Sequence, residues 1–186
     1  MCAGVKGQLK SSVSFWASTL DAPQFTLNTT SHGYRIPFAS YPAHCFLSNN
    51  LSALRHPDFV VHAISELLDN GCITEHSEPP FCVNPLTVAE GKKLRLVIDL
   101  RHVNCYLVRF KFKYEDLRML PQVLQEGHWF FHTYTSPDHQ KYLGFAWPLN
   151  DVLRDFTSAV SPFNLSSVFC FTKFLRPLVK HRRFMG

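Results

Sequence analysis

The sequence predicts an α+β fold, and three observations support this class. Apolar residues recur with a helical period in residues 57–71, and they alternate with polar residues in residues 93–101. The composition is that of a globular protein, with 46% hydrophobic and 18% charged residues and no low-complexity tract. A chain of 186 residues is expected to form one domain, with or without an N-terminal extension.

The helix is predicted over residues 57–71. Its apolar side chains fall on one helical face: Val60, Ala63, Ile64, Leu67 and Leu68. Pro57 suits the first turn of a helix, and Asp58 is favoured near the positive end of the helix dipole. Gly71 stands where many helices end with a residue in the left-handed conformation.

A β-hairpin is predicted next, with strands over residues 81–89 and 93–101 and a short turn at residues 90–92. In the second strand the apolar face consists of Leu94, Leu96, Ile98 and Leu100. The opposite face carries Arg95, Asp99 and Arg101 together with Val97. Two guanidinium groups are therefore expected to flank one carboxylate.

The remaining segments give weaker signals. Residues 1–56, which contain several prolines, are expected to form an extended arm with short turns. A short helix is predicted over residues 115–126, and residues 129–131 resemble the start of a buried strand. Residues 142–147 form another short apolar run, and residues 162–180 are expected to be mostly helical.

Positive charge is concentrated in two segments. Residues 91–118 hold eight Lys or Arg against three acids, and residues 171–186 hold five basic residues and no acid. Such clustering suits a surface that binds RNA or DNA, because contacts with phosphates supply most of the non-specific affinity. A solvated basic face that binds nothing explains the charge equally well.

The cysteines indicate neither a zinc site nor a disulfide framework, because no two of them form a C-x-x-C pair. The N-terminus has no apolar region of a signal peptide, and no apolar run reaches the roughly 18 residues that a membrane-spanning helix needs. The chain is therefore expected to be intracellular, cytoplasmic or nuclear, with reduced thiols and without membrane contact.

Several motifs resemble the reverse transcriptases of retroelements. Residues 63–73 (AISELLDNGCI), 83–88 (VNPLTV) and 92–104 (KKLRLVIDLRHVN) are similar to the fingers of that family. Residues 161–167 (SPFNLSS) resemble the palm motif that the family writes L-P-F-G-L; the matching residues are Pro162, Phe163, Asn164 and Leu165. Asn164 replaces the family's glycine.

Three further segments resemble the DIRS-type branch of retrotransposons, which encode a tyrosine recombinase: residues 33–38 (GYRIPF), 114–117 (YEDL) and 141–145 (KYLGF). The resemblance implies right-hand polymerase fingers with an incomplete palm. It divides the chain into an N-terminal extension (1–56), a fingers-like region (57–128) and a partial palm (129–186).

The resemblance also implies roles for the basic residues of the hairpin. Arg95 would contact a nucleotide triphosphate, with Lys92 or Lys93 supporting it at the turn. Asp99 and Arg101 would orient each other, and Arg101 completes the candidate phosphate-binding set. The alternative is an ordinary solvated hairpin with a row of ion pairs.

The catalytic site of the family has no counterpart here. Nucleotide addition needs two metal ions about 3.5–4 Å apart, held by carboxylates from two palm strands. Tyr134 stands about where the first aspartate belongs, and the Y-x-D-D turn that carries the second site does not occur before Gly186. We therefore expect no catalytic residue, no metal ligand and no cofactor in this chain, although the intact family uses Mg²⁺.

Two other groups of residues have a spacing that could suit a metal ion. Asp151 and Asp155 have the spacing of one helical face, but sequence drift is the preferred explanation. His128 and His132 would lie about 13 Å apart on a strand, too far for one ion, and with His139 are expected to be chance surface histidines.

Three functions remain open from the sequence. The first is a degenerate reverse-transcriptase fragment whose ancestral activity, RNA-directed DNA polymerisation, has been lost. The second is a non-catalytic module that binds nucleic acid through the basic hairpin. The third is a structural or interaction protein.

Overall fold

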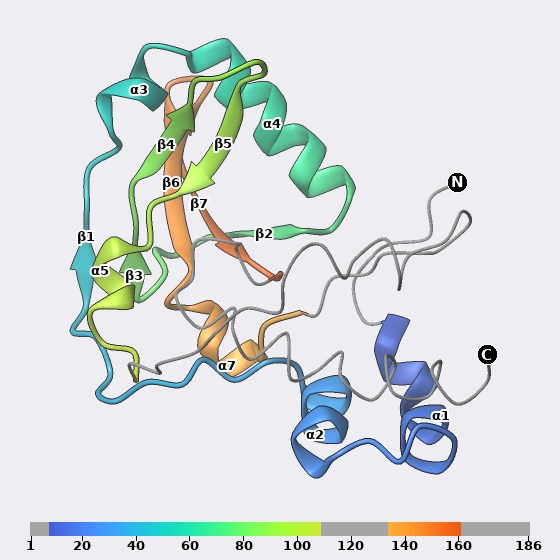
Figure 1. The fold of residues 1–186 in the computed structure, drawn as a ribbon. Coiled ribbons are helices and arrows are strands. Elements are labelled where there is room, and N and C mark those ends of the chain that lie inside the picture. Colours follow the sequence, from blue (N-terminus) through green and yellow to red (C-terminus); the bar gives the residue numbers. More distant parts are fainter. Residues whose placement is uncertain (1–7, 109–133, 161–186) are drawn as a thin grey trace.

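The computed structural model describes residues 8–108 and 134–160, and shows a mixed α/β fold (Figure 1). The helices are η1 (Gln8–Ser12), α1 (Val13–Ser18), α2 (Gln24–His32), α3 (Leu51–Leu54), α4 (Pro57–Asp69), α5 (Arg101–Asn104) and α7 (Pro137–Gln140). The strands are β1 (Cys45–Phe46), β2 (Ile73–His76), β3 (Cys82–Val83), β4 (Leu86–Ala89), β5 (Arg95–Ile98), β6 (Gly144–Leu149) and β7 (Val152–Ser158).

Some predictions lie outside the described residues. These are the helix over 115–126, the strand at 129–131 and the helix over 162–180, together with the four palm-motif residues, His128 and His132. In the parts that the structure describes, no helix has the length and apolar character needed to cross a membrane.

The main sheet has five strands in the order β1-β3-β6-β7-β2. β3 is parallel to both of its neighbours, whereas β7 is antiparallel to both of its neighbours, so the sheet is mixed. A second sheet consists of β4 and β5 alone. These two strands are antiparallel, with Leu86 opposite Ile98 and Ala89 opposite Arg95, which confirms the predicted hairpin.

Both strands of this hairpin are shorter than the sequence predicts. Residues 81–89 are split into β3, which belongs to the main sheet, and β4, which belongs to the small one. The break falls at Asn84 and Pro85, where proline has no N–H to donate to a ladder. β5 ends at Ile98, because the carboxylate of Asp99 accepts the backbone N–H of Arg101 at 3.2 Å and the chain turns into α5.

The hairpin of β6 and β7 contradicts the helical interpretation of Asp151 and Asp155. Six residue pairs join the two strands, from Gly144 opposite Thr157 to Leu149 opposite Val152. The connection is only Asn150 and Asp151, whose φ angles of 52° and 61° are those of a two-residue hairpin turn. Asp155 therefore lies in a strand, and no helix places it above Asp151.

The prediction for residues 57–71 is confirmed. α4 begins at Pro57, and Gly71 follows its end with a φ of 65°. Val60 and Ile64 are buried on the face that the periodicity indicates.

The prediction of an extended arm over residues 1–56 is wrong for residues 8–32, where η1, α1 and α2 form. Trp16, Leu20 and Ala22 make a small apolar cluster of their own there. α2 escapes a periodicity search because its buried side chains are threonines rather than aliphatic residues. Thr29 and Thr30 satisfy their hydroxyl groups by donating to the carbonyl oxygens four residues earlier, at 2.9 and 2.8 Å.

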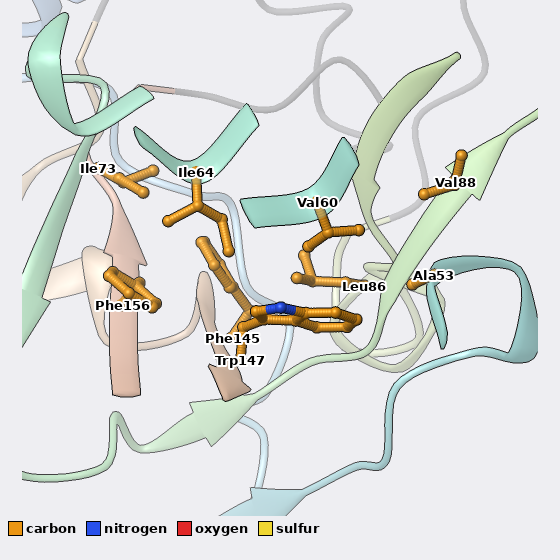
Figure 2. Close-up of a cluster of buried hydrophobic side chains, with 9 residues drawn as sticks. All are labelled: Ala53, Val60, Ile64, Ile73, Leu86, Val88, Phe145, Trp147 and Phe156. Atoms are coloured by element: carbon orange, nitrogen blue, oxygen red, sulfur yellow. The ribbon is translucent and has the colours of Figure 1, made fainter. Parts of the chain in front are cut away.

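The main core lies where α4 and both sheets meet (Figure 2). Figure 2 shows Val60 and Ile64 of α4 pointing toward Phe145 and Trp147 of β6. The whole cluster is Ala53, Val60, Ile64, Ile73, Leu86, Val88, Phe145, Trp147 and Phe156. The predicted fingers-like region and the predicted partial palm therefore share one hydrophobic core.

Candidate nucleic-acid interface

The tip of the β4–β5 hairpin carries three exposed cations, Lys92, Lys93 and Arg95. The nearest acid along the chain, Glu90, is already engaged: its Oε1 lies 3.1 Å from Nε2 of His56 and 4.0 Å from Nη2 of Arg55. Within residues 8–108 and 134–160, none of the three tip cations forms an ion pair. Their charge is thus available to an anion from outside.

Arg101 lies at the other end of β5 and is neutralised within the chain. Its Nη2 is 2.5 Å from Oδ2 of Asp99, and its Nε donates to both carboxylate oxygens at 2.9 Å. Asn50 donates to the same carboxylate at 3.1 Å. The hydrogen bond from Arg101 is the main cause that lowers the pKa of Asp99, so this carboxyl group stays ionised at neutral pH.

The predicted phosphate-binding set is therefore divided by the structure. Lys92, Lys93 and Arg95 are close in sequence at the tip. The far end of β5, at Ile98, lies roughly 10 Å from Arg95 at the usual rise per residue, and Arg101 follows that end. The mutual orientation of Asp99 and Arg101 is confirmed, but the expected row of Arg95, Asp99 and Arg101 does not form.

An open groove lies beside the Asp99–Arg101 pair. It has a volume of about 340 Å³ and is lined by Leu47, Pro85, Asp99, Arg101, His102 and Cys105. The sequence gives no reason to single out Asn50, yet its side-chain amide donates to Thr87 at 2.6 Å and also to Asp99. These bonds link the segment before α3 to the β4–β5 hairpin and to the groove. No local signal marks Asn50, because its partners lie 37 and 49 residues away.

Tyr134 is held by the N-terminal region rather than directed at a metal site. Its hydroxyl donates to the carbonyl oxygen of Ser31 at 3.1 Å, and its own carbonyl oxygen accepts the N–H of Tyr34 at 2.8 Å. Burial raises the pKa of the phenol, so it remains neutral and is a poor ligand for Mg²⁺. Among the residues that the structure describes, no group of three or more His, Cys, Asp or Glu is placed to hold a metal ion.

Two other positions that the sequence singles out are buried, and for His139 this contradicts the prediction of a surface residue. His139 is not a surface residue: it is 4% exposed, and its Nδ1 accepts the N–H of Ile36 at 2.9 Å. Burial, and then the charge of Arg35, lowers its pKa. Asp155 is buried in β7 beside His76 of β2, and burial raises its pKa although the charge of His76 opposes this.

Comparison with known proteins identifies the fold. No protein-family model and no curated protein matches the sequence. Among solved structures, the chain is similar to the foamy viral protease-reverse transcriptase in complex with dsDNA, with a TM-score of 0.55 and 18% identity over 79% of this chain and 32% of that one. It is also similar to the dRH form of that enzyme with dsDNA, with a TM-score of 0.54 and 20% identity over 79% and 26%. The chain spans about a third or less of these proteins, and its described part has a reverse-transcriptase-like fold.

Proposed function

We propose that this chain is a retroelement-derived reverse-transcriptase domain of the DIRS type that binds RNA or DNA through its hairpin tip and no longer polymerises. The observation that carries the binding proposal is the group of three exposed cations, Lys92, Lys93 and Arg95, without acidic partners in the described residues. The fold supports it, since both solved structures named above were determined with double-stranded DNA.

The chemistry of the tip suits phosphate better than a specific base. Arg95 offers a planar fork of donors that matches a phosphate group, and Lys92 and Lys93 add mobile point charges. Such contacts position a nucleic acid but do not read its sequence. We therefore expect binding with little sequence preference and a steep dependence on salt.

On this proposal, α4 and the β4–β5 hairpin belong to a fingers-like region, and β6 and β7 to a partial palm. The loss of polymerase activity rests on Tyr134, which stands about where the family has its first metal-binding aspartate. Its hydroxyl is committed to Ser31, and the described residues contain no group of three or more His, Cys, Asp or Glu placed to hold a metal ion. We expect no primer extension with Mg²⁺ or Mn²⁺; template-dependent incorporation by protein freed of contaminating polymerases would refute this part.

The binding proposal is tested by fluorescence anisotropy with labelled duplex and single-stranded oligonucleotides over a salt series. The variant Lys92→Ala/Lys93→Ala/Arg95→Ala removes the tip charges. The control Lys10→Ala/Arg35→Ala/Arg154→Ala removes three exposed charges elsewhere, one of which, Arg154, is already paired with Glu75 at 2.6 Å.

We expect the tip variant to lose roughly 10–100-fold in affinity at low salt and to flatten the salt slope by about 2–3, since each phosphate contact contributes about 0.7–0.9. The control is expected to stay within about threefold of the wild type, because its charges are dispersed. Equal losses in the two variants would show that only net charge matters and that the tip is not the interface.

A second candidate is an interaction module, favoured by exposed apolar side chains. Leu51 is 75% exposed on α3, and Val152 and Leu153 are each more than half exposed at the start of β7. This function predicts concentration-dependent association in sedimentation experiments and no response of the chain to polyanions.

A further inference from the structure

Cys45 and Cys82 lie directly opposite each other in neighbouring strands. β1 and β3 are parallel, and their register pairs Cys45 with Cys82 and Phe46 with Val83. Paired residues on adjacent strands have Cα atoms about 4.8 Å apart and side chains on the same face. This spacing falls within the range of about 4.4–6.8 Å that a disulfide bond spans.

The two thiols differ in their access to solvent. Cys82 is fully buried, whereas Cys45 is partly exposed at the edge of the main sheet. The Sγ of Cys82 lies 3.6 Å from the carbonyl oxygen of Ala43, which stands two residues before β1. Burial, and then a hydrogen bond and the charge of Cys45, raises the pKa of Cys82 to about 12, while Lys141 opposes this rise. A reagent from solvent therefore meets Cys45 first.

We propose that Cys45 and Cys82 form a reversible dithiol–disulfide pair, with Cys45 as the attacking thiol and Cys82 as the resolving thiol. With glutathione disulfide as the oxidant, the Cys45 thiolate attacks one glutathione sulfur, forms a mixed disulfide and releases one glutathione thiolate. Cys82 then loses its proton and attacks the Cys45 sulfur. The bond between the two protein sulfurs forms, the bond to glutathione breaks, and the second glutathione leaves as a thiol.

The cross-link would fasten an edge that is held weakly in the reduced protein. β1 has two residues, which pair with the two residues of β3, and flanking backbone bonds run from Cys45 N to the Phe81 oxygen at 3.2 Å and from Leu47 N to the Val83 oxygen at 2.9 Å. The bond closes a loop that contains α3, α4 and β2. Closing a loop of this length restricts the unfolded chain, and we expect the Tm to rise by about 5–15 °C.

The fold also explains why the spacing of the cysteines in the sequence does not reveal this pair. The two residues stand 37 positions apart on strands that are separated by two helices and a strand, so no short motif joins them. Among the four cysteines that the structure describes, this is the one pair placed in strand register; Cys72 and Cys105 have no cysteine opposite them.

The test is a titration of the purified full chain in glutathione redox buffers, followed by alkylation of the remaining thiols with N-ethylmaleimide and peptide mapping without reduction. We expect a cross-link between the peptides of Cys45 and Cys82, together with the rise in Tm. Cys45→Ser removes both results, whereas the matched controls Cys72→Ser and Cys105→Ser keep them.

A second measurement checks the proximity of the thiols without any oxidation. Phenylarsine oxide joins two adjacent thiols through one arsenic atom and releases water, so intact mass detects it. We expect one arsenical to bridge Cys45 and Cys82 in the reduced chain, and Cys82→Ala to abolish the bridge. Any of three results would overturn the proposal. These are the absence of the arsenical bridge, a disulfide between other cysteines, and a Cys45–glutathione adduct that persists although the arsenical bridge forms.

Discussion

The two hairpins of this molecule have the same topology but opposite surroundings. β4–β5 is a two-stranded sheet with one face on the core, and its tip is basic and exposed. β6–β7 lies in the middle of the five-stranded sheet, and Phe145 and Phe156 stack within it at 5.2 Å, both fully buried. We infer that the first hairpin is available for binding and that the second holds the fold together.

The largest expected difference between the hairpins is in stability. Phe145→Ala removes a fully buried ring from the core and is expected to lower the free energy of unfolding by about 3–5 kcal/mol. Lys93→Ala, at the exposed tip of the other hairpin, is expected to change it by less than about 0.5 kcal/mol. Urea unfolding followed by circular dichroism measures both. Similar losses in the two variants would mean that the tip is packed rather than exposed.

The same contrast explains how far the sequence could predict the fold. Residues 93–101 alternate between apolar and polar side chains except at Val97, and this pattern predicts the hairpin strand of which β5 covers Arg95–Ile98. The first four residues of β6 are all buried, so no alternation marks them. The signal that could have revealed β6–β7 was the pair Asn150 and Asp151 between two apolar runs, which favours a two-residue hairpin turn.

The candidate site was predicted in part. Lys92, Lys93 and Arg95 share a tip because they are neighbours in sequence, and local reasoning is sufficient for that. The position of Arg101 depends on the turn at Asp99, which interrupts the strand and which alternation alone does not reveal. Asn50 reaches this carboxylate from a distant part of the chain, and such contacts follow from the fold rather than from any local pattern.

Two aspartates, one near each hairpin, are expected to affect stability with opposite dependence on pH. The pKa of Asp99 is lowered in the folded state, so its ionised form stabilises the fold above the ordinary carboxyl pKa, and this contribution is lost as pH falls through the folded pKa. The pKa of Asp155 is raised by burial, so the folded state binds its proton more tightly than the unfolded state. Its contribution is present at low pH and is lost as pH rises through the folded pKa.

The measurement is the free energy of unfolding of the wild type minus that of each Asn variant, followed across the acidic range. For Asp99→Asn this difference is expected to rise with pH and to reach about 1–3 kcal/mol at neutral pH, because charge-assisted hydrogen bonds to Arg101 and Asn50 are lost. For Asp155→Asn it is expected to fall as pH rises. Slopes of the same sign would show that one of the two carboxyl groups lies in a different environment.

The smallest expected effect concerns the two turns. Asp151 has a φ of 61°, which costs energy for a residue with a side chain, so Asp151→Gly is expected to stabilise the β6–β7 turn by about 0.5–1 kcal/mol. Gly91, in the other hairpin, does not have a positive φ, and a Cβ there would meet only the carbonyl oxygen of Lys93 at 3.9 Å. Gly91→Ala is therefore expected to be neutral or slightly stabilising, since alanine restricts the unfolded chain without strain. Thermal unfolding of the two variants measures this contrast, and a clear loss of stability in Gly91→Ala would show that the basic tip depends on a backbone conformation that only glycine adopts freely.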